Sequence, residues 1–269
     1  MTVAVLGCGR LGTALARALL QHGYAVIGWT RSAASARRAK RCGVPCTSGA
    51  LPDLGSAAII FLTVPDPAVA PFAARVRPLV SPGAILVHCS ARLDRTGVDG
   101  SLHPLCTVPD GRVDLTGVAC ALDGTLPALR ALTPVARKLG LHAIRIAPRH
   151  RTRYHAGAVL GAGGLVALVA AATDLLAAAG LGHAKARAAI LPLLRSTLAA
   201  LERDRKKWPL TGPVARGDAQ AVQAHLQALP PSIRDLYRAL SRAQLELAKK
   251  QKMATFKALR EIRKTLARS

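Results

Sequence analysis

The chain has 269 residues, enough for two domains of ordinary size, and 51% of them are hydrophobic while only 3% are aromatic. This composition excludes a chain that is disordered over most of its length and predicts a core of Ala, Val, Leu and Ile. The 38 Lys and Arg residues outnumber the 14 Asp and Glu residues, so the net charge is +24. Such a surface attracts polyanions and phosphorylated ligands, but we expect most of the charge to be arginine scattered over solvated faces.

The six cysteines show no paired spacing of the kind that frames disulfides or a zinc site. Cys42 and Cys46 lie close in sequence but lack a second ligand pair, so no metal site is expected. The chain begins directly in a predicted strand, without a charged and apolar leader. We therefore expect free, mostly buried thiols in a reducing cytoplasm.

Short apolar runs alternate with helical periodicity over the first half of the chain. The predicted strands are 2–6, 24–29, 58–64, 84–88, 118–122 and 143–146, and helices are predicted over 33–42, 67–77 and 126–139. Continuous apolar runs are typical of parallel strands that are covered on both faces. The alternation predicts an α/β fold with a doubly wound, mostly parallel Rossmann sheet.

After Pro148 the pattern becomes helical throughout, which predicts an all-helical C-terminal domain. The predicted division is 1–148 for the dinucleotide-binding domain, 149–248 for a substrate or dimerisation domain, and 249–269 for a basic tail. The uncharged stretch 156–173 meets the length of a membrane span. Because it is rich in Ala and Gly and lacks flanking aromatic residues, we predict a buried central helix and no membrane span.

A glycine-rich motif, Gly7-Cys8-Gly9-Arg10-Leu11-Gly12, follows the first predicted strand and opens a helix. In a dinucleotide site the first glycine permits the turn, the second lets the pyrophosphate approach, and the third lets helix and strand pack closely. The backbone N–H groups of this turn and helix start then face the ligand. The competing interpretation is that the glycines serve only a tight turn.

The end of the second strand indicates which coenzyme would bind. NAD-specific sites place an Asp or Glu there, but this chain has Thr30-Arg31-Ser32. Arg31 can neutralise a 2′-phosphate, with the two hydroxyls as further donors. The sequence therefore predicts NADP, although it does not exclude a deazaflavin used alongside it.

Two more strand ends are expected at the same crevice, because ligands lie beyond the carboxyl ends of parallel strands. The third strand ends in Thr63-Val64-Pro65-Asp66, and the fourth is followed by Ser90. Asp66 is equally compatible with a helix cap.

These motifs, together with Ser101-Leu102-His103-Pro104-Leu105, Tyr154-His155 and Thr211-Gly212-Pro213-Val214-Ala215-Arg216-Gly217-Asp218, resemble Rossmann-like bacterial proteins with a C-terminal DUF2520 domain. The chain is more distantly similar to pyrroline-5-carboxylate reductase, ketopantoate reductase and the hydroxyisobutyrate dehydrogenases. The resemblance implies an NADP-binding domain followed by a helical domain that closes the substrate cleft, often at a dimer interface, so a homodimer is expected. The chain departs from its relatives at Gly163-Gly164, where they tend to carry an Asn, and this departure puts catalysis in doubt.

Hydride transfer to a carbonyl or imine requires a proton donor and a group that stabilises negative charge. We predict His103, on the loop after the fourth strand, and His155 as candidate proton donors, and Arg216 as a holder of an anionic substrate group. Thr211 and Asp218 are candidate substrate-binding residues. Each histidine is also compatible with a structural role, and Asp218 with a helix N-cap.

The segment from Lys249 onward reads as a basic amphipathic helix, with Phe256, Leu259, Ile262 and Leu266 on its apolar side. It could meet nucleic acid, an anionic surface or an acidic partner, but docking on the body of the protein is favoured. The leading hypothesis for the whole chain is an NADP-dependent oxidoreductase of a small, possibly anionic substrate. A non-catalytic NADP-binding sensor or scaffold and a polyanion-binding protein are the alternatives.

Overall fold

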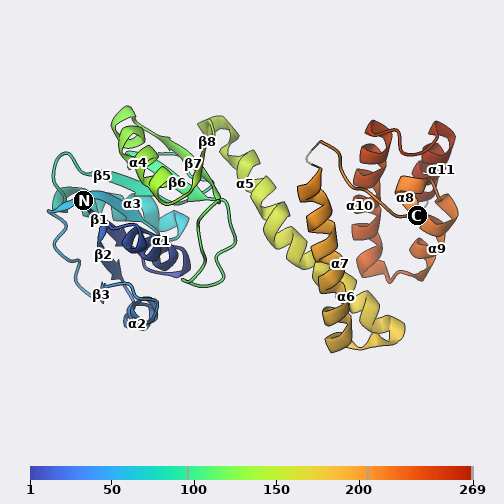
Figure 1. Ribbon diagram of the computed structural model, residues 1–269, viewed down its shortest axis with the longest axis horizontal. Coiled ribbons are helices and arrows are strands. Elements are labelled where there is room, and N and C mark those ends of the chain that lie inside the picture. The colour runs from blue at the N-terminus through green and yellow to red at the C-terminus, as the bar shows by residue number, and fades with distance from the viewer. Residues whose placement is uncertain (96, 205, 268–269) are drawn as a thin grey trace. The chain divides into compact units, whose positions relative to one another are not determined.

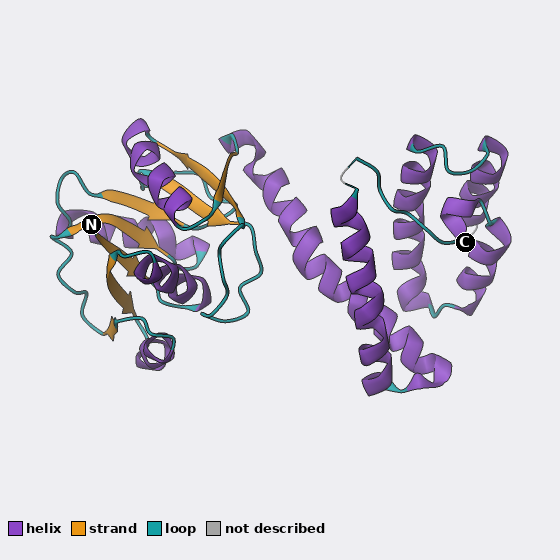
Figure 2. Cartoon of the chain, viewed as in Figure 1, coloured by secondary structure: helices purple, strands orange, loops and turns teal. Residues whose placement is uncertain are grey.

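The computed structural model describes residues 1–95, 97–204 and 206–267. Two compact units make up the chain, Met1–Leu165 and Val166–Ser269. The first unit carries the strands and the helices that cover them, and the described part of the second is helical (Figures 1 and 2). The predicted combination of an α/β domain and a helical C-terminal region is therefore confirmed.

The first unit is built on an eight-stranded sheet in the order β3-β2-β1-β4-β5-β6-β7-β8. Neighbouring strands are parallel, except that β6 and β7 are antiparallel. The chain reverses direction across the sheet between β1 and β4, where open α/β sheets bind ligands. The strands are β1 (Thr2–Leu6), β2 (Ala25–Thr30), β3 (Cys46–Ser48), β4 (Ala57–Leu62), β5 (Ile85–His88), β6 (Gly100–Pro104), β7 (Ala119–Gly124) and β8 (His142–Arg145).

Successive residues of β1 enter two separate cores, one on each face of the sheet. Val3 and Val5 pack in the core that contains residues of α1 (Arg10–Gln21), α2 (Ala33–Arg41) and α4 (Leu126–Lys138). Ala4 and Leu6 pack in the core that contains residues of α3 (Asp66–Val76). Because successive side chains of a strand point to opposite faces, a strand with a core on each side must be apolar throughout. The sheet is thus doubly wound, as predicted.

Two strands were not predicted, β3 and β6. The prediction that His103 lies on a loop was wrong, because His103 is inside β6. The β6 sequence Gly-Ser-Leu-His-Pro has no apolar run, so its composition gave no strand signal. It forms a strand because β5 and β7 flank it, and its backbone pairs with both. This pairing holds His103 on a regular element.

Helices follow β8 to the end of the described chain, and the boundary between the units falls later, after Leu165. The run begins with η2 (Pro148–His150), α5 (Arg151–Val159), the π-helical turn η3 (Leu160–Gly164), α6 (Leu165–Leu176) and a second π-helical turn, η4 (Ala177–Leu181). It continues with α7 (His183–Arg203), α8 (Pro213–Arg216), α9 (Ala219–Ala228), α10 (Pro231–Lys250) and α11 (Phe256–Ala267), while the short η1 (Arg77–Leu79) extends α3. Gly163 and Gly164 close the first π-helical turn, an irregularity that often marks functional positions.

The expectation of a buried central helix was wrong for the single chain. In the helical stretch Pro148–Leu181, only 6% of the most apolar 18-residue segment is buried. By length and composition alone this stretch could cross a membrane. Leu160 and Val166 are 74% and 69% exposed. An uncharged, apolar composition indicates that a helix is shielded from water. It does not distinguish burial inside the chain from burial against a partner chain or a membrane.

The basic helix α11 is part of the core of the second unit. Leu259, Ile262 and Leu266 are buried with residues of α9 and α10, whereas Phe256 is exposed. The basic residues Lys257, Arg260, Arg263 and Lys264 face solvent. The apolar stripe therefore accounts for the docking of this helix, and binding of a polyanion by its charged face stays a prediction.

Candidate functional site

The glycine motif forms a tight connection between β1 and α1, with different roles for its glycines. Gly7 has φ of 112°, and a Cβ there would lie 2.7 Å from the Thr63 carbonyl oxygen. A Cβ on Gly12 would lie 2.4 Å from Thr63 Oγ1 and 2.5 Å from the Gly7 oxygen. Any side chain at either position would push α1 away from the strands. Gly9 has its nearest neighbour at 3.7 Å, so its surface is open to a ligand.

The first turn of α1 offers unpaired backbone donors. The first hydrogen bond of the helix runs from Thr13 N to the Gly9 oxygen, 3.0 Å, and Gly9 supplies no side-chain cap. The N–H groups of Arg10, Leu11 and Gly12 precede that bond, and no acidic residue lies in this turn. Such a helix start carries a partial positive charge and binds anions.

A cleft of about 500 Å³ lies at the carboxyl end of β1, β2 and β4, and we name it the glycine-loop cleft. It brings together eight of the predicted coenzyme-binding residues, Gly7, Gly9, Thr30, Arg31, Ser32, Thr63, Val64 and Pro65. The remaining lining residues are Trp29, Ser35, Ala68, Pro71, Phe72 and Arg75, which the sequence did not single out. Among the described residues no carboxylate lines this cleft, and Arg31 and Arg75 give it positive charge.

Local contacts fix the walls of this cleft. The Trp29 ring stacks on Phe72 at 5.5 Å, and its Nε1 donates to the Ala50 oxygen at 3.0 Å. Ser32 caps α2, accepting from Ser35 N at 3.4 Å. These contacts leave the Arg31 side chain exposed at the end of β2, where a ribose phosphate would lie.

Five predicted coenzyme-binding residues lie outside the cleft lining. Gly12 and Leu11 belong to the buried and half-buried side of α1, and Arg10 lines a separate cavity. Asp66 is the first residue of α3 and pairs with Arg92 at 3.4 Å. Ser90 Oγ accepts from Leu93 N at 3.0 Å, so its side chain holds a turn. Their roles toward a coenzyme stay predictions.

A second cleft, of about 700 Å³, surrounds His103, and we name it the His103 cleft. The sequence did not predict Tyr154 as a site residue, but its hydroxyl lies 2.8 Å from His103 Nδ1. The two rings are perpendicular, with centroids 5.6 Å apart. The predicted residue His155 lines the same cleft. The other lining residues are Leu105, Cys106, Thr107, Gly157, Ala158, Val159, Gly161, Ala162 and Gly163.

Burial sets the protonation states of this pair. Burial, together with the positive charges of His155 and Arg151, lowers the pKa of His103 to about 4. Burial likewise raises the pKa of Tyr154 to about 12. Both groups are therefore uncharged at neutral pH. His103 carries no extra proton at this pH that it could donate to a substrate. The Tyr154 hydroxyl keeps its proton at neutral pH, and its hydrogen-bond partner is His103 Nδ1.

Arg151 fixes the helix that carries Tyr154. Its side chain is 4% exposed, and its Nη2 contacts Ser101 Oγ on β6 and Asp123 Oδ2 on β7, the latter at 3.3 Å. Asp123 Oδ2 also lies 3.9 Å from Arg95 Nε. Because Arg151 is the first residue of α5, the contact with Ser101 ties the helix start to β6, which carries His103, and the ion pair with Asp123 ties it to β7. Tyr154 follows three residues later, on the turn so positioned.

The remaining predicted site residues belong to the second unit. Asp218 caps α9, accepting from Ala221 N at 2.9 Å, and Arg216 and Thr211 are exposed. Gly217 has φ of 76°, and a Cβ there would lie 2.6 Å from Ala258 Cβ of α11. The capping role of Asp218 is thus observed. A cavity shared by Arg216 and His103 stays a prediction.

The described residues contain free cysteines only, four of them buried, as predicted. Burial raises the pKa of Cys8, Cys89 and Cys120, which keeps these thiols protonated and unreactive. Among the described residues there is also no group of three His, Cys, Asp or Glu side chains placed to hold a metal ion.

Two protein-family models match the chain, one in its N-terminal part and one in its C-terminal part. Residues 2–92 match the family described as NADP oxidoreductase, coenzyme F420-dependent, and residues 118–244 match the domain of unknown function DUF2520. The chain is therefore a Rossmann-like protein with a C-terminal DUF2520 domain, and the resemblance inferred from its motifs is confirmed. The first match indicates a nicotinamide or similar nucleotide coenzyme. A search among curated proteins gave no match.

Solved structures share this fold along most of the chain. A proposed NADP oxidoreductase from Bacteroides fragilis is 23% identical, with a TM-score of 0.76 over 90% of this chain and 97% of that one. Protein TM1727 from Thermotoga maritima is 22% identical, with a TM-score of 0.73 over 94% of this chain and 100% of that one. Arogenate dehydrogenase from Synechocystis is 19% identical, with a TM-score of 0.55 over 99% and 89%. The chain therefore shares its fold with these proteins.

The low pKa of His103 predicts an acid-sensitive contribution to stability. The folded pKa of about 4 lies below the ordinary value of 6.5, so the unfolded chain binds the extra proton between these pH values. Stability is full above pH 6.5 and falls as the pH drops toward 4, by at most about 3 kcal/mol. Urea unfolding of the wild type should show this loss, and His103→Gln should lack it.

His142→Gln removes an exposed histidine from β8 and is the matched control. Equal pH dependence of the unfolding free energy in the wild type and His103→Gln would show that His103 titrates normally in the folded protein.

Proposed function

We propose that the protein is an NADP(H)-dependent oxidoreductase that acts on a small carbonyl or imine substrate. The observation that carries the proposal is the glycine-loop cleft, which joins an open helix N-terminus to the end of β2, where Arg31 follows. The described residues that line this cleft include no carboxylate. A ribose with a free 2′-hydroxyl would find no carboxylate acceptor there, whereas a 2′-phosphate would find a guanidinium and two hydroxyls.

The coenzyme fits the residues present. The pyrophosphate would lie over Gly9 and accept from the free N–H groups of the first turn of α1, because the space above Gly9 is open. Arg31, Thr30 and Ser32 would hold the 2′-phosphate. The apolar wall that includes Ala68 and Pro71, with the Arg75 guanidinium beside it, would cover the adenine. When bound, the coenzyme supplies hydride to or accepts it from the substrate carbon.

The residues of the His103 cleft would handle the proton. Tyr154 stays protonated up to high pH, so its hydroxyl can donate to the oxygen or nitrogen on which negative charge develops. His103 Nδ1, 2.8 Å away, orients that hydroxyl. In the tautomer with its proton on Nδ1, His103 can pass that proton to the Tyr154 oxygen while Nε2 takes one from solvent. In the opposite direction neutral His103 accepts the proton that Tyr154 takes from an alcohol. His155 lines the same cleft as a second polar group.

The coenzyme assignment predicts a selective loss at Arg31. In Arg31→Gln the affinity for NADPH should fall about 10- to 100-fold, the worth of a charge-assisted contact, while the affinity for NADH changes less than about twofold. Isothermal calorimetry measures both affinities. Lys40→Gln removes a positive charge from α2, the helix that follows Arg31, outside the glycine-loop cleft and should leave both values unchanged. An equal loss for the two coenzymes would place the 2′-phosphate elsewhere.

The proton-transfer assignment predicts that Tyr154→Phe abolishes turnover without abolishing coenzyme binding. NADPH oxidation is followed at 25 °C against a panel of keto acids, imino acids, simple ketones and an oxidised deazaflavin. With any substrate that the wild type turns over, kcat should fall about 100-fold or more, and NADPH affinity should stay within about twofold. Tyr24→Phe, a tyrosine outside the cleft, is the control.

Tight NADPH binding by the wild type with no oxidation anywhere in the panel would favour the sensor or scaffold. Gly163 and the small residues around it in the His103 cleft supply no polar side chain to hold a substrate, which is the feature that favours this second function.

We further propose that a second copy of the chain covers the apolar helical stretch Pro148–Leu181. Its exposed large side chains continue onto α7, where Leu193 and Leu198 are 60% and 51% exposed. An apolar surface of this extent is rare on a monomer in water. The arginine- and lysine-rich sequence on either side of the stretch has no aromatic belt of the kind that anchors a membrane span.

Leu160 tests this dimer. Sedimentation of the wild type in detergent-free buffer should give the mass of two chains, and Leu160→Glu should shift it to one chain, because the charge would be buried at the interface. Leu126→Glu, at a 61% exposed leucine that begins α4, should stay dimeric. A monomeric wild type, or recovery of the protein only with membranes, would contradict the proposal.

A further inference from the structure

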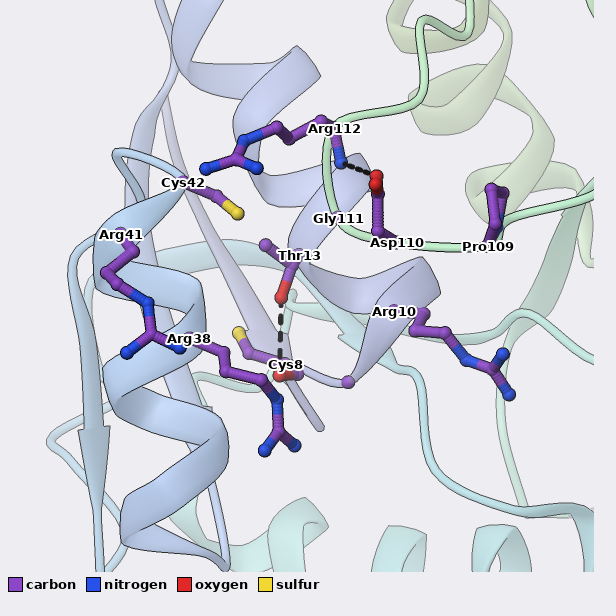
Figure 3. A pocket seen from close by; sticks show the side chains of 11 residues that line it. Cys8, Arg10, Thr13, Arg38, Arg41, Cys42, Pro109, Asp110, Gly111 and Arg112 are labelled. Atoms are coloured by element: carbon purple, nitrogen blue, oxygen red, sulfur yellow. Dashed lines mark hydrogen bonds between the residues drawn. The ribbon is translucent and has the colours of Figure 1, made fainter.

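A third cavity, of about 480 Å³, adjoins the glycine loop at Cys8, Gly9 and Arg10. Figure 3 shows it between the start of α1, the second half of α2 and the loop 109–112 that joins β6 to β7. We name it the arginine pocket, because Arg10, Arg38, Arg41 and Arg112 line it. The other lining residues are Cys8, Gly9, Thr13, Cys42, Pro109, Asp110 and Gly111.

The loop that forms one wall of this pocket is fixed in place. Gly111 packs so closely on α1 that a Cβ would lie 2.4 Å from Thr13 Cγ2. Arg17 Nη1 donates to the Arg112 oxygen at 3.0 Å, and Asp110 Oδ1 accepts from Arg112 N at 2.7 Å. Backbone contacts therefore hold Arg112, and its guanidinium is left to face the cavity (Figure 3).

The pocket concentrates positive charge that the described residues do not neutralise. Arg38 donates to Ser35 Oγ at 2.6 Å, which is a neutral partner. In the described part of the chain no carboxylate lies within ion-pair distance of any of the four guanidinium groups. Asp110 is the single acidic residue of the lining, and its carboxylate is engaged with the loop backbone. Like charges gathered in one cavity repel one another, and a multiply charged anion removes that cost.

We propose that the arginine pocket is a binding site for a phosphorylated anion, separate from the coenzyme. Each guanidinium group can donate two parallel hydrogen bonds to two oxygens of one phosphate. Four guanidinium groups therefore suit a ligand with two phosphoryl groups, or a phosphate ester with a second anionic group. Among the described residues, neither Arg31 nor any residue of β2 lines the pocket, and Gly9 is the one residue that the two cavities share. A bound anion would thus adjoin the coenzyme's pyrophosphate without replacing it.

The site is tested with inorganic pyrophosphate as the probe, titrated by calorimetry into the full-length protein saturated with NADPH, so that the glycine-loop cleft is filled. We expect binding that weakens steeply as salt rises, and a loss of at least tenfold in affinity in the double variant Arg41→Gln/Arg112→Gln. Arg37→Gln/Arg145→Gln, which removes two exposed arginines outside both cavities, should bind within about twofold of the wild type. Arg41→Lys/Arg112→Lys keeps the charge and should fall between them.

Two results would overturn the proposal. One is no pyrophosphate binding, or equal affinity in the wild type and in Arg41→Gln/Arg112→Gln when both have the same thermal midpoint. The other is competition in which NADPH displaces pyrophosphate and NADH does not, because the pocket would then hold the coenzyme's own 2′-phosphate. If the protein binds neither coenzyme, the same titration on the free protein still compares the variants, so the pocket and the proposed function fail separately.

Discussion

The close approach of α1 to the ends of β1 and β4 is the constraint on which the proposed coenzyme site depends. Only glycine at positions 7 and 12 lets the helix start against Thr63, and this start directs unpaired N–H groups toward the carboxyl edge of the sheet. An anion bound there satisfies donors that the helix cannot satisfy itself. The glycine-loop cleft and the arginine pocket both reach Gly9 of this loop, and in our two proposals each binds a phosphate group.

A second constraint comes from the buried pair of Arg151 and Asp123. Neither side chain meets a substrate in our account, but together they join α5 to β6 and β7 and so bring Tyr154 to His103. Burial then keeps both members of the Tyr154–His103 pair neutral at physiological pH. A neutral phenol beside a neutral imidazole can pass a proton in either direction, which suits a reversible reduction.

The parts of the fold with a periodic apolar pattern were predictable, and so was most of the glycine-loop cleft. Thr30-Arg31-Ser32 and Thr63-Val64-Pro65 follow strands that are apolar throughout, so parallel topology places them together. Tyr154 and β6 were not predictable, because one depends on a helix start fixed by a distant Asp123 and the other on neighbours that supply its pairing. The burial of residues 156–173 was misjudged because hydropathy indicates that a helix is shielded from water, but does not indicate which surface shields it. Trp29, Phe72 and Arg75 lie too far apart in sequence for a local motif.

Calorimetric titration of the purified protein with NADPH and with NADH tests the central claim most directly. Our account predicts uptake of one NADPH per chain, with an affinity at least about tenfold higher than for NADH and a preference that shrinks as salt screens the phosphate contact. Uptake of neither coenzyme would contradict the account at its base, and tighter binding of NADH would contradict the role given to Arg31.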